Sequence, residues 1–103
     1  MSFHLTNKAK ADLIDIAHYT DEQWGRQQRN KYLAQIDAVF HDLGDMPHQG
    51  TACDDIRRGY RKFRVGKHII FYRLIEASHI EIVRILHGSM DVKSRMSTDE
   101  TVD

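Results

Sequence analysis

Cysteine, proline and long apolar runs are scarce in this chain of 103 residues, and each scarcity excludes something. The single cysteine, Cys53, rules out an internal disulfide and is compatible with a reducing compartment. No stretch approaches the roughly 20 consecutive apolar residues of a membrane-spanning helix, and no charged start followed by an apolar run indicates a signal peptide. We therefore expect a cytoplasmic protein with no membrane partner. Cys53 is far in sequence from any activating base and is expected to be unreactive.

Metal-ligand spacing is also absent, although histidine is abundant. The 7 histidines form no His-x-His or His-x-x-x-His pair, and there is no second cysteine to join them. We expect no metal site and no other cofactor.

Net charge is the third absence, because 15 Lys and Arg residues balance 15 Asp and Glu residues. Neutrality argues against bulk affinity for nucleic acid, and no direct sequence-specific binding to it is expected. The balance is nevertheless a cancellation, since residues 56–73 contain no Asp or Glu and carry +7. Their cations are Arg57, Arg58, Arg61, Lys62, Arg64, Lys67 and Arg73. Interleaved aromatic residues are typical of a strand with one buried and one solvated face. The basic residues are either a contact surface for an acidic partner or the solvated side of a sheet, and the pattern leaves both open.

Apolar periodicity predicts a helical hairpin near the start of the chain. Residues 2–6 alternate as a short strand, and Thr6 or Asn7 can cap a helix that runs to about Trp24. Gly25 marks a tight corner before a second helix that ends near Leu43, so the two helices pack antiparallel. In the first helix the spacing places Ala9, Leu13, Ile16, Ala17 and Thr20 on one face, and Asp12, Asp15 and His18 mostly on the other.

The second half of the chain reads as a loop followed by three strands. Residues 43–55 hold the only proline and form the loop, and strands follow at 56–65, 68–75 and 80–86. Short turns make these strands an antiparallel meander, and the middle one, apolar on both sides, is expected to be central. The last strand alternates, with Ile80, Ile82 and Arg84 opposite Glu81, Val83 and Ile85. The prediction is an α+β domain over residues 1–92, in the order β-α-α-β-β-β. Both helices cover one face of a small antiparallel sheet, and residues 93–103 form a disordered polar tail.

One set of residues suggests acid–base chemistry. A ribonuclease that uses the RNA 2′-hydroxyl needs a base, an acid and cations near the phosphorus. Arg61, Arg84 and His87, with Tyr60 nearby, could supply some of these groups from neighbouring strands. Only one such histidine is present, without an evident second acid–base partner. A strand-end histidine with a structural hydrogen bond is the competing interpretation.

Four segments carry a resemblance to a known family: KADLIDIAHYT, WGRQQRNKYL, DDIRRGYRKFRVGKHIIFYR and IEIVRILHGSMD. Over roughly residues 3–92 the chain resembles the ParE branch of the RelE/ParE toxin superfamily. The resemblance implies the fold predicted above and a hetero-oligomer with a ParD-like antitoxin, whose C-terminal segment orders across the sheet and helices. It also implies DNA gyrase as the target, inhibited by binding without catalysis.

The RelE branch implies the alternative, a ribosome-dependent mRNA endoribonuclease in which Arg61, Arg84 and His87 would be catalytic. This chain lacks the dense Lys/Arg set over several strands and the additional C-terminal Arg or Tyr that such a site uses, which favours gyrase inhibition. Arginines suit bidentate pairing with the carboxylates of an acidic, partly disordered antitoxin. The expected antitoxin- or target-binding residues are Arg57, Arg58, Tyr60, Arg61, Arg64, His87 and Met90, with residues 87–92 a second candidate for the gyrase contact.

Overall fold

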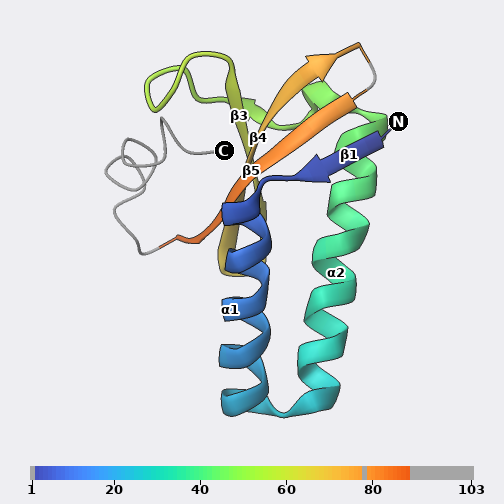
Figure 1. Cartoon of the computed structure of the whole chain (residues 1–103), viewed down its shortest axis with the longest axis vertical. Coiled ribbons are helices and arrows are strands. Elements are labelled where there is room, and N and C mark those ends of the chain that lie inside the picture. The colour runs from blue at the N-terminus through green and yellow to red at the C-terminus, as the bar shows by residue number, and fades with distance from the viewer. Residues whose placement is uncertain (1, 78, 89–103) are drawn as a thin grey trace.

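The computed structural model describes residues 2–77 and 79–88, in which two helices cover one face of a five-stranded sheet (Figure 1). The elements are β1 (Ser2–Leu5), α1 (Asn7–Trp24), α2 (Arg26–Asp45), the 3-10 turn η1 (Pro47–Gln49), β2 (Thr51–Ala52), β3 (Tyr60–Val65), β4 (His68–Glu76) and β5 (His79–His87). The sheet order is β1-β5-β4-β3-β2, with β1 parallel to β5 and the other neighbours antiparallel. The predicted fold class is confirmed, whereas the predicted tail at 93–103 lies outside the described residues.

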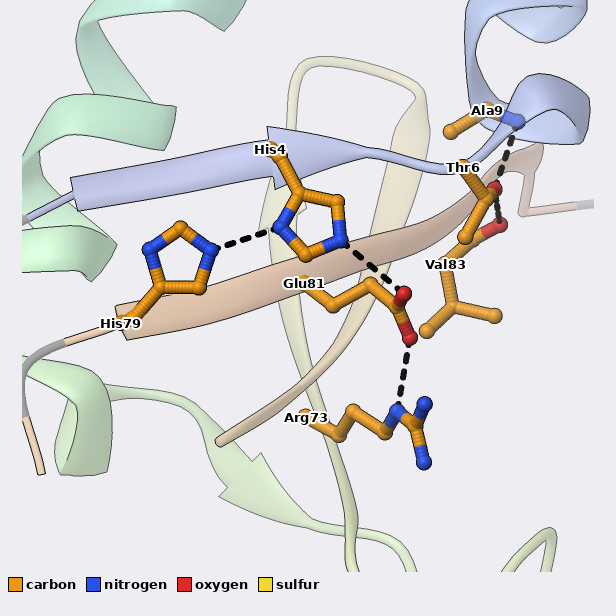
Figure 2. A network of polar contacts seen from close by, with 7 residues as sticks. All are labelled: His4, Thr6, Ala9, Arg73, His79, Glu81 and Val83. Carbon is orange, nitrogen blue, oxygen red and sulfur yellow. Dashed lines mark hydrogen bonds and ion pairs between the residues drawn. The ribbon is translucent and has the colours of Figure 1, made fainter. Parts of the chain in front are cut away.

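Local signals at the helix ends produce the hairpin. The Thr6 hydroxyl oxygen accepts a hydrogen bond from the Ala9 N–H at 3.0 Å and donates to the Val83 carbonyl at 2.8 Å (Figure 2). One side chain therefore caps α1 and fastens its start to β5. Gly25, at φ +92°, separates α1 from α2 and gives the corner that the sequence predicted. The joined end of the hairpin extends past the sheet (Figure 1).

Two apolar clusters lie on opposite faces of the sheet. The larger one packs Ile16, Ile36 and Phe40 of the helices against sheet residues that include Ile70 and Ile82. The smaller one contains Cys53, Phe71, Val83 and Leu86, with Ile56 and Tyr60 packed against it. Strand β4 contributes to both clusters, which confirms the central position predicted for it.

Strand β3 begins at Tyr60, so the predicted start at residue 56 is wrong. The Gly59 N–H donates to the Asp54 carboxylate at 2.8 Å, and Gly59 adopts φ +84°, a conformation that glycine accepts readily. The amides of Ile56 and Arg57 both donate to the Cys53 carbonyl. Local turn chemistry thus places residues 54–59 in a loop, which lies over the smaller apolar cluster.

The strict alternation predicted over residues 80–86 is also wrong. Phe71 pairs with Arg84 while Tyr72 pairs with Ile82, so Val83 is an extra residue in β5. The irregularity changes the phase of the strand, and Ile85 joins the helix-side core while Val83 joins the opposite cluster.

Candidate functional site

A basic face lies on the side of the sheet opposite the helices. We use this name for Arg57, Arg58, Lys62 and Arg64. The last three are exposed, and Arg57 is half-buried with its guanidinium carbon 5.5 Å from the centre of the Tyr60 ring. Arg57 and Arg58 belong to the loop and Lys62 and Arg64 to β3. The cations therefore lie on one side of the molecule, two in a loop and two in a strand.

Arg61 is separated from this basic face. Arg61 is half-buried and lies on the same face of β3 as Phe63 and Val65, which pack in the helix-side core. Its guanidinium donates to the carbonyls of Gly50 at 3.0 Å and His48 at 3.3 Å. Arg61 thus fastens η1 and Gly50, which directly follows it, to β3.

Arg73 is neutralised by a network that crosses three strands (Figure 2). Its Nε donates to Glu81 at 2.7 Å, and His4 Nε2 lies 3.0 Å from the other carboxylate oxygen. His4 Nδ1 is in turn 2.6 Å from His79 Nε2. Burial by itself raises the pKa of Glu81, but the hydrogen bonds and charges of Arg73 and His4 outweigh it and leave that pKa below its ordinary value. The Glu81 carboxylate therefore stays ionised, and Arg73 contributes little to the basic face.

Arg84 forms a buried ion pair with Asp12 of α1. Two guanidinium nitrogens donate to the carboxylate at 2.8 and 2.9 Å, and the Ile85 amide donates to it at 2.9 Å. The sequence placed Asp12 mostly on the solvent side of the helix, and this placement is wrong because only 9% of the residue is exposed. Within the described residues, the pairing of β5 with β1 ends at Ile82, and the Asp12 carboxylate takes the place of a strand partner for Ile85.

His87 lies opposite His68 on β4, with the two rings edge to face and their centres 5.4 Å apart. The Tyr32 hydroxyl donates to the Val65 carbonyl at 3.1 Å, so its oxygen accepts the hydrogen of His68 Nδ1 at 2.7 Å. Burial and then repulsion from His87 lower the pKa of His68, against an opposing effect of Asp12, and His68 is neutral at pH 7. The pairing of His68 with His87 was not among the sequence predictions. Counting outward from the predicted turn at 76–79 would have placed residue 68 opposite residue 87.

Both histidines line a groove of about 480 Å³ between the helix corner and the β3–β4 turn. Its other walls come from α1 and α2 and include Tyr19, Trp24 and Tyr32. Trp24 is 70% exposed and Tyr19 is 61% exposed, so two residues with large aromatic rings are open to solvent here.

The structure does not bring Arg61, Arg84 and His87 together. The β4 partners of Arg61 and His87 are Tyr72 and His68, four positions or about 13 Å apart along the strand. Arg61 and Arg84 already make structural hydrogen bonds. Met90, and the part of the second candidate surface beyond Gly88, lie outside the described residues.

Within residues 2–77 and 79–88, no three His, Cys, Asp or Glu side chains are placed to share a metal ion. No helix in that part of the chain is long and apolar enough to cross a membrane. Burial raises the pKa of the Cys53 thiol, so the thiolate is disfavoured.

These features define the class of the protein: a small α+β domain with one sheet face under a helical hairpin and a basic opposite face. Residues 3–92 match the family described as ParE toxin of type II toxin-antitoxin system, parDE, and the chain belongs to that family. The resemblance seen in the sequence is thereby confirmed.

Individual relatives agree with this assignment. Toxin ParE1 of Mycobacterium tuberculosis is 40% identical over 88 residues, which cover 85% of this chain and 90% of that protein. Toxin ParE1 of Caulobacter vibrioides is 34% identical over 94 residues, covering 91% and 96%. A solved structure described as the chromosomal ParDE TA system from P. aeruginosa superposes with a TM-score of 0.71 at 25% identity, covering 84% of this chain and 95% of its own.

Proposed function

We propose that this protein acts in the cytoplasm as a toxin that inhibits DNA gyrase by binding, and that a ParD-like antitoxin holds it inactive in a hetero-oligomer. Membership of the ParE family carries the proposal. The geometry supports binding over catalysis. Arg61 and Arg84 already serve the fold, and the described residues do not gather them with His87 into a nuclease centre.

The basic face suits the acidic part of an antitoxin segment. Arg58 and Arg64 are exposed, and the guanidinium of Arg57 lies over Tyr60, so carboxylates could pair with cations beside an aromatic ring. On the other side of the molecule, an apolar groove of about 290 Å³ lies between α1 and α2. Its lining includes Leu13 and Leu33. A segment that orders on binding can cover both surfaces, as the family resemblance implies.

A supercoiling assay tests the activity directly. Gyrase, relaxed plasmid and the antitoxin-free protein are combined, and we expect loss of supercoiling with accumulation of linear, cleaved plasmid that antitoxin reverses. Undisturbed gyrase together with codon-dependent mRNA cleavage would overturn the proposal in favour of a ribonuclease. His87→Ala separates the two mechanisms, because a binding toxin loses at most the one contact that His87 makes with gyrase and keeps most of its inhibition, whereas a nuclease that uses His87 loses its activity.

The antitoxin contact is tested by charge reversal. Arg58→Glu and Arg64→Glu together should weaken the complex with the antitoxin, and the weakening should shrink as salt is raised. Lys31→Glu is the matched control, because Lys31 is exposed on α2, away from the basic face. Equal affinity of the double variant and the control, measured by calorimetry, would remove the basic face from the antitoxin interface.

A further inference from the structure

The groove between the helix corner and the β3–β4 turn has the dimensions of a ligand site. Its volume of about 480 Å³ falls within the usual range for small-molecule pockets, roughly 300–1,000 Å³. The aromatic residues that line it, Tyr19, Trp24 and Tyr32, belong neither to the basic face nor to the predicted nuclease residues.

The turn beside the groove is held rigidly. The Tyr32 hydroxyl contacts the Val65 carbonyl, the Lys67 amide and His68 Nδ1 at 3.1, 3.3 and 2.7 Å. Gly66 adopts φ +57°, and a Cβ added there would lie 2.6 Å from the Tyr32 oxygen. The turn and α2 are therefore locked together, and the groove is formed before anything enters it.

The charges around the groove favour an anionic occupant. Among the described residues, its lining includes the exposed cation Lys67 and no Asp or Glu. Arg64 donates to the Gly66 carbonyl at 3.3 Å, and its guanidinium is 3.1 Å from the position of a Cβ added at Gly88, so a second cation lies beside the turn. The nearby acid Asp12 is already paired with Arg84.

The exposed rings favour an occupant with flat faces. Trp24 and Tyr19 are 70% and 61% exposed at the mouth of the groove. Aromatic rings next to cations are the combination with which proteins hold unpaired bases and their phosphates, because the base stacks while the cation neutralises the backbone. The carboxylates of an acidic peptide would pair with the cations but would not stack on the rings.

We propose that this groove binds an unpaired base of single-stranded DNA, with the base stacked on Trp24 and the adjoining phosphate near Lys67. The choice of DNA over RNA rests on the proposed function, since gyrase acts on DNA. The binding is independent of base sequence and adds a DNA contact to a toxin otherwise argued to bind protein.

Trp24 is the only tryptophan of the chain, so binding can be followed by its own fluorescence. The antitoxin-free protein is titrated with ten-nucleotide oligomers of dT and dA up to about 1 mM, which is tenfold above the weak end of non-specific dissociation constants, roughly 0.1 mM. We expect quenching with a dissociation constant that rises with salt. No quenching over this range, or quenching only by an antitoxin peptide, would overturn the inference.

Variants locate the contact by anisotropy of a labelled dT oligomer, and circular dichroism checks their folding. Loss of one stacking contact weakens such complexes by roughly tenfold, so Trp24→Leu should bind at least about tenfold more weakly, whereas Met46→Ala, also exposed but distant, should not. Lys67→Glu should abolish binding that Lys62→Glu retains. If Lys62→Glu is the more harmful change, the DNA lies on the basic face and the inference is wrong.

An RNA oligomer of the same length separates the two nucleic acids, and tenfold tighter binding of RNA would overturn the choice of DNA. The supercoiling assay is run in parallel on wild-type protein. Gyrase inhibition without oligomer binding sinks only the groove inference. Oligomer binding without gyrase inhibition sinks the proposed function and, with it, the reason for preferring DNA.

Discussion

Replacing Asp12 by alanine should be among the most damaging single changes in this protein. The carboxylate accepts two hydrogen bonds from Arg84 and one from the Ile85 amide, at 2.8, 2.9 and 2.9 Å, and its side chain is 11% exposed. Its removal leaves a guanidinium whose own side chain is only 10% exposed without this counter-ion. Breaking a buried pair in this way costs about 3–5 kcal/mol, out of a total stability of roughly 5–15 kcal/mol for a domain.

Urea unfolding measures this loss. With a slope of roughly 1–3 kcal/mol per molar for a small protein, the midpoint of Asp12→Ala should fall by at least about 1 M. Asp15→Ala is the control, because Asp15 is exposed on the same helix and its loss should stay within about 0.5 kcal/mol.

A second variant tests the cause. Asp12→Ala combined with Arg84→Met removes both charges and should recover part of the lost stability. A remainder of about 1–3 kcal/mol should persist, because the Ile85 amide still lacks its acceptor. If Asp12→Ala is no worse than Asp15→Ala, or if the double variant is as unstable as the sum of its parts, the account of the pair is wrong.

Two further predictions concern backbone strain and pH. Gly59→Ala should reduce the free energy of unfolding by about 1–2 kcal/mol, the cost of the left-handed conformation alone, because a Cβ there meets nothing within 4 Å. Gly66→Ala should cost more, because its Cβ also clashes with Tyr32. Equal losses of stability for the two variants in thermal unfolding would contradict this account. The pKa of Glu81 is lowered in the folded state. The Glu81 carboxylate therefore stabilises the fold at a pH above its pKa in the unfolded chain, about 4.3, and this stabilisation is lost as the pH falls through its lower pKa in the folded protein. Glu81→Gln should therefore lose less stability than the wild type between about pH 5 and pH 3, measured by urea unfolding at each pH, whereas the exposed Glu76→Gln should follow the wild type.

The order and kind of the main elements could be predicted from the amino-acid sequence. Thr6 and Gly25 mark the ends of α1 by capping and by a left-handed conformation, which are local properties and can be read from the chain. The central position of β4 could also be predicted, because a strand with apolar residues on both faces must be covered on both. The four segments that resemble the family predicted the fold and the class of the protein, and the family match confirms that class.

The roles of the charged residues depend on contacts between elements that are far apart in the sequence. Helical periodicity predicts that Asp12 faces the solvent. Because β1 ends beside Ile82, the Ile85 amide at the edge of β5 donates its hydrogen bond to the Asp12 carboxylate instead of to a strand. Arg61 and Arg84 read as candidate catalytic cations because neither the loop at Gly50 nor the helix at Asp12 is near them in sequence. The groove of Trp24, Tyr32 and His68 likewise joins the helix corner to a turn about 40 residues later, a contact that exists only once the hairpin packs on the sheet.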